Sequence, residues 1–298
     1  MQRQPLSSNK FNDELLLGGF EGHASSTSPE ELSKIARHIR MLTLTMLTTA
    51  KASHLGSAFS IIDILTVLYH NVLDTEKIKH STQLRDYFIL SKGHAVSALY
   101  ATLMSVNIIS EDLVPFYNKI GTGLCGCPIK DSYPGIEAST GSLGHGLPMA
   151  VGLALALKHD EKPNKVYVLV GDGECQEGAI WEAIMVASRY KLNNLIIIVD
   201  YNNLQAIDRS NDIMPGTLDE KFRAFGCATI TIDGHDYAQI HCALTMPKTA
   251  PLVIIANTIK GKGISFAEDK LEWHYKSPNQ EEFLQAQKEL EDPCELHL

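Results

Sequence analysis

One stretch of the chain, Gly171 to Leu204, constrains the fold more than any other. The apolar run Val166–Val170 ends at a Gly-Asp-Gly turn, a helical stretch follows, and a second apolar run covers Leu195–Val199. Strand, turn, helix and strand in this order form a βαβ unit, whose connection is right-handed and whose strands are parallel. The sequence therefore predicts an α/β fold with a mostly parallel sheet flanked by helices.

Polar residues directly follow both strands of this unit. Asp172 comes just after the first strand, and Asn202 comes shortly after the second. Open α/β sheets bind ligands at the carboxyl ends of their strands. A carboxylate and an amide oxygen suit a hard cation such as Mg²⁺, which keeps oxygens of a phosphate as further ligands. Gly171 and Gly173 let the backbone approach an anion closely, so we expect a phosphate site here.

The complete pattern resembles the diphosphate-binding motif of thiamine diphosphate enzymes. That motif joins Gly-Asp-Gly to Asn-Asn across about thirty residues in a strand-helix-strand context. Here its two ends are Gly171-Asp172-Gly173 and Asn202-Asn203. A plain βαβ turn with an acidic residue would explain the first end alone, but it would not explain both ends at this spacing.

Length, charge and cysteine usage narrow the function class. The 298 residues suffice for one large α/β domain or two small ones. The formal net charge of −9 argues against a nucleic acid or an anionic membrane surface as the main partner. We expect no signal peptide, and no stretch apolar enough to span a bilayer. The six cysteines lack the spacing of a disulfide framework, which favours reduced thiols in the cytoplasm.

Helix and strand signals organise the chain into one domain. We expect residues 1–27 to form a flexible amino-terminal arm and residues 28–298 to form the domain. Ser28, Pro29 and Glu31 have the spacing of a helix start with a capping box, and that helix should end near residue 50. Further helices are expected over residues 61–71, 95–104, 148–158 and 279–290, and further strands over 86–90, 229–232 and 252–256.

Two histidines and a glycine-rich turn lie next to these elements. His54 is on a short polar loop between two helical stretches, where a helix cap is the other interpretation. His94 follows the strand at 86–90 and precedes a helix, a position where anions bind. The irregular region 110–143 is long enough to indicate a functional loop. It leads into a turn around Gly144 whose small residues let a flat ligand or a phosphate come close.

Several segments, in order, resemble transketolase. They are RDYFILSKGHAVSALYATL, PGIEASTGSLGHGLPMAVGLALA, GDGECQEGAIWEA, DYNNLQ, and TIKGKG with the later WH. They cover roughly residues 30 to 280 and match only the amino-terminal, diphosphate-binding module. A full transketolase continues with a pyrimidine-binding module and a carboxyl-terminal module. The chain therefore resembles the amino-terminal subunit of a split transketolase, which implies a three-layer thiamine diphosphate-binding fold.

This resemblance implies roles for the matching residues. Asp172, Asn202 and the backbone carbonyl of Leu204 would bind Mg²⁺ (or Ca²⁺), which bridges the two phosphates of thiamine diphosphate. The family's catalytic histidines match His54, His94 and His274, with His54 acting on the substrate carbonyl as a proton donor or acceptor. The residues implied in cofactor binding are His94, Gly144, Gly171, Asp172, Gly173, Glu174, Asn202 and His274.

The resemblance also implies the reaction and a partner. Transketolase transfers a two-carbon ketol unit from a ketose donor to an aldehyde acceptor. Its proton-relay Glu and its sugar-phosphate ligands lie in the pyrimidine-binding module, so this chain should need a carboxyl-terminal subunit, giving an α2β2 heterotetramer. Glu177 matches a family acid of the subunit-interface network. No nucleic acid and no membrane is expected as a partner.

Other readings of the same motif remain open. The chain could resemble a 1-deoxyxylulose-5-phosphate synthase-like enzyme or a component of a 2-oxoacid-decarboxylating thiamine enzyme. The stretches GDGECQEG and GSLGHG favour transketolase over both. A non-catalytic cofactor-binding scaffold is a third reading, and it gives no reason for His54.

Two departures from the family lie on the substrate side. The middle loop reads Gly126-Cys127-Pro128 where the family usually has Gly-His-Pro. That family His contacts the donor's hydroxyl end, whereas Cys is a weak hydrogen-bond donor and acceptor. The first histidine loop reads Ser-His-Leu-Gly around His54, not the commoner Ser-Gly-His-Pro-Gly. We therefore expect the family's cofactor site with different donor contacts.

Overall fold

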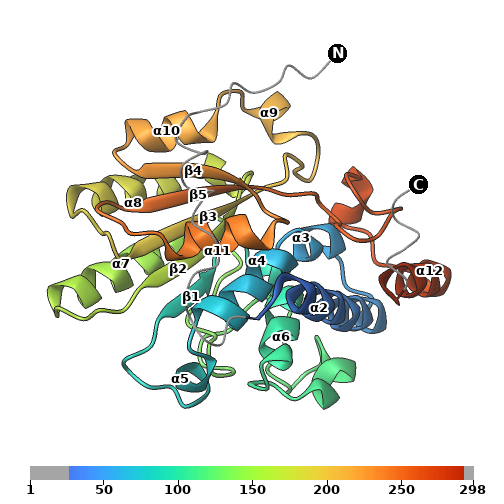
Figure 1. Cartoon of the computed structure of the whole chain (residues 1–298). Coiled ribbons are helices and arrows are strands. Elements are labelled where there is room, and N and C mark those ends of the chain that lie inside the picture. The colour runs from blue at the N-terminus through green and yellow to red at the C-terminus, as the bar shows by residue number, and fades with distance from the viewer. Residues whose placement is uncertain (1–26, 292–298) are drawn as a thin grey trace.

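A single parallel sheet lies at the centre of the molecule (Figure 1). The computed structural model describes residues 27–291, so the predicted arm, except Thr27, lies outside the described residues. The strand order is β1-β2-β3-β5-β4, and every neighbouring pair is parallel, which confirms the predicted α/β class. The strands are β1 (Tyr87–Leu90), β2 (Val166–Gly171), β3 (Leu195–Tyr201), β4 (Ala228–Asp233) and β5 (Leu252–Asn257).

Both faces of the sheet are covered by helices, so the molecule has three layers (Figure 1). Alternate residues of β2 enter different cores: Val168 packs on one side and Leu169 on the other. Strands buried on both faces consist of continuous apolar runs. The positions of β2 and β3 could therefore be predicted from the sequence. One layer holds α2 (Pro29–Ala50), α3 (Leu55–Phe59), α4 (Ile62–Val67), α6 (Val96–Ser105) and α11 (Tyr237–Thr245); the other holds α7 (Gly146–His159), α8 (Gly178–Arg189) and α10 (Leu218–Ala224).

The predicted helix boundaries agree with the structure to within a few residues. Ser28 caps α2 by accepting a hydrogen bond from the Glu31 amide at 3.3 Å. The helix expected over residues 61–71 is divided into α4 and the π-helical turn η1 (Leu68–Val72). The remaining elements are α5 (Thr75–Lys79), η2 (Gly93–Ala95), η3 (Glu111–Phe116), η4 (Glu174–Gln176), α9 (Ser210–Ile213), η5 (Leu271–His274) and α12 (Gln280–Glu291).

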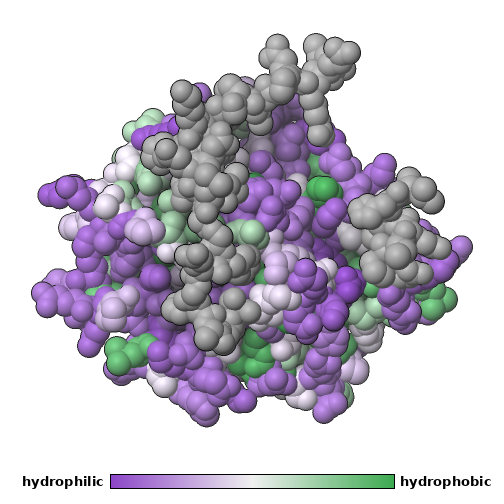
Figure 2. Space-filling model, viewed as in Figure 1, coloured by the Kyte–Doolittle hydropathy of each residue, from purple (hydrophilic) through white to green (hydrophobic). Residues whose placement is uncertain are grey.

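One apolar segment corrects an expectation drawn from the sequence. Leu55–Val72 is helical and apolar enough, by length and composition alone, to cross a membrane. However, 83% of this segment is buried inside the protein, as expected for a core helix. On the face seen in Figure 2, the described surface is mostly hydrophilic, with hydrophobic residues in small separate areas.

Candidate functional site

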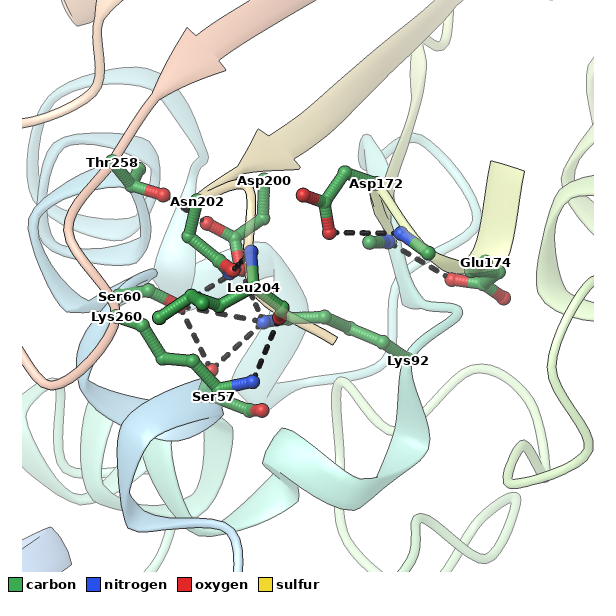
Figure 3. Close-up of polar contacts among 12 residues, drawn as sticks. Ser57, Ser60, Lys92, Asp172, Glu174, Asp200, Asn202, Leu204, Thr258 and Lys260 are labelled. Carbon is green, nitrogen blue, oxygen red and sulfur yellow. Dashed lines mark hydrogen bonds and ion pairs between the residues drawn. The ribbon is translucent and has the colours of Figure 1, made fainter. Parts of the chain in front are cut away.

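The three predicted metal ligands lie beyond the carboxyl ends of β2 and β3 (Figure 3). Asp172 is buried, and its carboxylate accepts hydrogen bonds from three groups. Oδ1 accepts from the Gly173 amide at 2.8 Å, and Oδ2 accepts from the Asn203 amide at 2.7 Å and from Ser210 Oγ at 2.8 Å. Burial and the nearby charge of Asp200 raise the pKa of Asp172 to about 6. The charged form of Asp172 is therefore destabilised in this site, and a bound cation would stabilise it.

The amide of Asn202 is fixed by hydrogen bonds at both ends. Its Nδ2 donates to Asp200 Oδ2 at 2.9 Å, and its Oδ1 accepts from the Leu204 amide at 3.0 Å. The Leu204 carbonyl accepts a hydrogen bond from Lys260 Nζ at 2.8 Å. We name Asp172, Asn202 and Leu204 the metal wall.

The donor set of the metal wall fits a hard cation. It consists of a carboxylate, an amide oxygen and a backbone carbonyl, which are the ligand types that Mg²⁺ and Ca²⁺ take. Asp172 Oδ1, Asn202 Oδ1 and the Leu204 carbonyl oxygen each accept one hydrogen bond from the protein and can accept a further contact. Within residues 27–291 no group of three or more His, Cys, Asp or Glu side chains is placed to hold a metal ion.

A buried ion pair that sequence reasoning missed lies behind the metal wall. Lys92 Nζ donates to Asp200 Oδ2 at 2.6 Å and to the Ser57 carbonyl at 2.8 Å. Asp200 Oδ2 also accepts from Ser60 Oγ at 2.8 Å, and Thr258 donates to its Oδ1 (Figure 3). Burial by itself raises the pKa of Asp200, but the adjacent Lys92 ammonium holds it below its usual value. Asp200 is thus a charged anchor for the Asn202 amide.

Lys260 is a second buried cation, and it joins the metal wall to His274. Its side chain is 1% exposed, and its Nζ lies 2.8 Å from His274 Nδ1. An ammonium has no acceptor, so Nδ1 is the acceptor and the proton of a neutral His274 is on Nε2. Burial and the Lys92 charge lower the pKa of Lys260 to about 8. The sequence did contain a signal for these two site residues, because Lys92 and Lys260 each come shortly after a buried strand.

The structure brings the three predicted histidines together, and we name them the histidine cluster. Ring centroids are 4.9 Å apart for His54 and His94, 5.3 Å for His54 and His274, and 6.0 Å for His94 and His274. Burial, with added repulsion from Lys92 and Lys260, lowers the pKa of each ring, that of His274 to about 3. The histidine cluster is therefore neutral at neutral pH.

His54 is held in an unusual conformation. Its φ is 74°, in the left-handed region that costs a β-carbon-bearing residue free energy, and its amide donates to the His274 carbonyl at 3.2 Å. It is the N-cap residue of α3, as the helix-cap interpretation expected, and its carbonyl accepts from the Ala58 amide at 3.0 Å, but its side chain makes no capping hydrogen bond. Its Nδ1 is buried without a hydrogen-bond partner. A buried polar atom of this kind calls for a ligand.

Glu174, predicted to contact the cofactor, is directed at the protein itself. Its Oε1 accepts from Ser91 Oγ at 2.5 Å and from the Gly144 amide at 2.8 Å, and its Oε2 accepts from the Gly171 amide at 3.0 Å. Burial raises the pKa of this carboxyl. Glu174 thus ties the glycine-rich turn to the end of β2. Direct cofactor contacts by Glu174, Gly144 and Gly171 stay a prediction.

At two positions in these turns a neighbouring side chain lies too close to leave room for a β-carbon, which explains why the residue is glycine. A β-carbon at Gly173 would stand 2.9 Å from Gln205 Cγ, and one at Gly144, whose φ is +82°, would stand 2.7 Å from Glu177 Cβ. Cys127, the departure from the family, is half-buried, and its Sγ is 3.2 Å from the place of a β-carbon on Gly141. Cys127 therefore packs against the segment that leads into the glycine-rich turn.

Comparisons with known proteins agree with this geometry. Residues 32–292 match the family model described as "Transketolase, thiamine diphosphate binding domain". One of the subunits of an apulose-4-phosphate transketolase, from Actinobacillus succinogenes, is 43% identical over 269 residues, which are 89% of this chain and 98% of that protein. The 6-deoxy-6-sulfo-D-fructose transketolase subunit SqwG from a Clostridium species is 40% identical over 266 residues, covering 88% of this chain and 96% of that protein.

Longer transketolases match only in part. Human transketolase is 36% identical over 250 residues, which are 83% of this chain but 40% of the human protein. The solved transketolase of Campylobacter jejuni has a TM-score of 0.81 and 29% identity over 89% of this chain and 43% of its own length. The chain thus spans less than half of these two proteins and nearly the full length of the two bacterial subunits. It belongs to the transketolase family, as a thiamine diphosphate-binding domain of the kind found in those separate subunits.

Proposed function

We propose that this chain binds the diphosphate half of thiamine diphosphate and, with a carboxyl-terminal partner subunit, transfers a two-carbon ketol unit from a ketose to an aldehyde. One observation carries the proposal. The metal wall lies at the same sheet edge as the histidine cluster, and Lys260 contacts both Leu204 of the wall and His274 of the cluster. This arrangement supports a cation-diphosphate site next to a proton-transfer site.

In this proposal the metal wall holds Mg²⁺ (or Ca²⁺). Asp172 supplies the charge, while Asn202 and the Leu204 carbonyl supply neutral oxygens. Asp200 fixes the Asn202 amide, so that its oxygen is available to the cation. The chemistry that the cofactor supplies when bound is a nucleophilic carbon that carries the two-carbon unit.

The histidine cluster handles protons in this proposal. The ring of His54 exchanges a proton with the substrate carbonyl oxygen. Neutral rings can serve as acceptors or donors, depending on the tautomer. His274 Nδ1 accepts a hydrogen bond from the Lys260 ammonium, so the proton of the neutral ring is on Nε2. Nε2 is therefore the hydrogen-bond donor of this ring.

The outer face of α7 and α8 supports a partner subunit. Met149 on α7 and Met185 and Val186 on α8 are exposed, and Leu143 of the glycine-rich turn is exposed as well. Large contiguous patches of exposed apolar side chains mark interaction surfaces, and these side chains would contribute to one. We propose that this surface lies at a subunit boundary of an α2β2 assembly, as the exposed Glu177 beside it was expected to do.

The test is an assay of the chain alone and of the chain with its carboxyl-terminal partner, both with cofactor, Mg²⁺ and an aldehyde. The donor panel should contain apulose-4-phosphate and 6-deoxy-6-sulfo-D-fructose, since two relatives are named for these sugars. Pyruvate belongs in the panel because it distinguishes the decarboxylating thiamine enzymes. We expect ketol transfer only from the reconstituted pair and no turnover of pyruvate.

The control is the reconstituted pair with Asp172→Asn, which keeps the shape of the side chain and removes its charge. Full activity of the isolated chain would refute the need for a partner. Turnover of pyruvate, but of no ketose, would refute ketol transfer. Binding of the cofactor by the pair without turnover of any donor would favour a scaffold.

A further inference from the structure

A network of two buried and two half-buried side chains lies outside the site described so far. Arg40 of α2 donates to both carboxylate oxygens of Asp63 on α4, at 3.1 and 2.6 Å. His235, in the loop between β4 and α11, lies with its Nδ1 2.7 Å from Asp63 Oδ2. Tyr237 donates from its hydroxyl to Asp63 Oδ1 at 3.1 Å. Arg40 and Asp63 are both buried, so removing either charge would leave the other buried without a counter-charge.

This network holds a backbone segment, Ile259 to Lys262, at two points. The Ile259 amide donates to His235 Nε2 at 2.9 Å, and Arg40 Nε donates to the Lys262 carbonyl at 3.0 Å. Because Nε2 accepts from an amide, the ring proton of a neutral His235 is on Nδ1 and is donated to Asp63. Lys260, whose ammonium reaches Leu204 and His274, lies between the two points.

We propose that His235 is a positioning residue for the candidate site. By accepting from the Ile259 amide while Asp63 fixes its ring, it holds the backbone that carries Lys260, and through Lys260 it places the Leu204 carbonyl and the His274 ring. The roles of the Leu204 carbonyl and the His274 ring rest on the proposed function. The chain of contacts from His235 through Lys260 to these two groups does not.

Two observations favour a positioning role over simple stabilisation. A buried ion pair adds little stability compared with well-packed apolar residues, so stability alone gives no reason for it. The space around Lys260 is also tight: a β-carbon on Gly56 would stand 2.9 Å from Lys260 Cγ. Because the Lys260 side chain has little free space, it could not compensate for a shift of its backbone, and the ammonium would move with the backbone. Displacements of about 1 Å at such groups change rates roughly 100-fold.

Two substitutions separate the two hydrogen bonds of His235. His235→Asn keeps a donor near the position of Nδ1, for Asp63, and removes the acceptor for Ile259. His235→Gln keeps an acceptor near the position of Nε2, for Ile259, and removes the donor for Asp63. His159→Asn, on the exposed end of α7, is the matched control.

The experiment uses the full chain without cofactor and has two readouts by nuclear magnetic resonance. The first is the hydrogen-exchange rate of the Ile259 amide relative to amides of β2. The second is the ring ¹⁵N signal of His274, which reports its contact with Lys260 and would not respond to a general loss of stability. Neither readout depends on transferase activity, so failure of this proposal is distinguishable from failure of the proposed function.

We expect His235→Asn to accelerate exchange at Ile259 roughly 10- to 100-fold and to shift the His274 Nδ1 signal. His235→Gln should retain both values close to those of the unmodified chain. Equal behaviour of the two variants, or faster exchange at Ile259 with an unchanged His274 signal, would overturn the proposal. If neither variant folds, the unmodified chain still decides, because the proposal requires a bare Nε2 on His235 coupled to the Ile259 amide; a protonated Nε2 refutes it.

Discussion

The metal wall and the histidine cluster share one edge of the sheet but differ in how complete they are. In the metal wall, each side-chain oxygen of Asp172 and Asn202 already accepts a hydrogen bond from the protein. In the histidine cluster, His54 has a strained backbone and a buried Nδ1 without a partner. The first region is organised before any ligand arrives, whereas the second leaves an interaction for a ligand to complete.

The two regions also differ in charge. Burial and Asp200 raise the pKa of Asp172, while burial and two lysines lower the pKa of the three histidines. The wall therefore has a stressed anion that a cation would stabilise, and the cluster has neutral rings suited to proton transfer. Lys260 connects them, with its ammonium bonded to the Leu204 carbonyl and to His274. Because the charge of the wall and the rings of the cluster are on different side chains, cation binding and proton chemistry should respond to different substitutions.

The largest expected effect comes from the metal wall. Asp172→Asn removes the one charge of the wall and should weaken Mg²⁺ and thiamine diphosphate binding by more than the roughly 10- to 100-fold typical of residues that only support a ligand. Because the pKa of Asp172 is raised to about 6 in the folded chain, the group costs stability as pH rises from about 4 to about 6, and the full cost is present above pH 6. The variant should gain stability from the lost charge and lose some because its amide NH2 would face a donor amide of Gly173 or Asn203, so thermal stability should change much less than cofactor affinity.

Calorimetry on the reconstituted complex and thermal unfolding of the chain measure these two quantities. Asp212→Asn, on the exposed part of α9, is the control. Unchanged cofactor affinity in Asp172→Asn would remove the metal assignment.

A substitution in the histidine cluster should do the opposite. His54→Ala is expected to slow turnover by ~10²–10⁴-fold, the usual contribution of one proton-transfer group, with cofactor affinity nearly unchanged. His54→Asn should lose as much, although Asn adopts the left-handed backbone more readily, because the imidazole is what matters. Steady-state kinetics with parallel calorimetry tests this. Lost cofactor binding with normal turnover per bound cofactor would contradict the role given to His54.

The pH dependence of stability should separate the two regions further. Unfolded histidine has a pKa of about 6.5, whereas the pKa of His274 in the folded chain is lowered to about 3. As pH falls, the unfolded state takes up protons first, so the free energy of unfolding should decline below about pH 6.5. Urea midpoints between about pH 8 and pH 5.5 measure the slope.

His274→Gln should flatten this slope, and His159→Gln on the surface should not. Equal slopes in all three chains would show that the histidine cluster does not carry the effect.

The smallest expected effect is at Cys127, which packs against the segment that leads into the glycine-rich turn. Cys127→His restores the family's residue in a half-buried loop and should alter the preference among ketose donors rather than the fold or the cofactor affinity. The measurement is kcat/KM across phosphorylated and unphosphorylated ketoses. Identical ratios across the panel would show that this position does not contact the donor.

Much of the fold was accessible from local sequence patterns. The runs Val166–Val170 and Leu195–Val199 are apolar on both faces, and such strands are buried only in a parallel sheet between two helical layers. Asp172 and Asn202 could be placed at one edge because parallel strands end on the same side. These inferences need only the order of neighbouring residues.

The tertiary structure alone decided where the buried charges go. Lys92 pairs with Asp200 across 108 positions of sequence, and Glu174, which is in the motif, is directed into the protein by the amides of Gly144 and Gly171. Nothing local distinguishes these side chains from solvated ones. A charge is retained in the interior only when distant segments bring it a partner, and that partner is known only once the chain has folded.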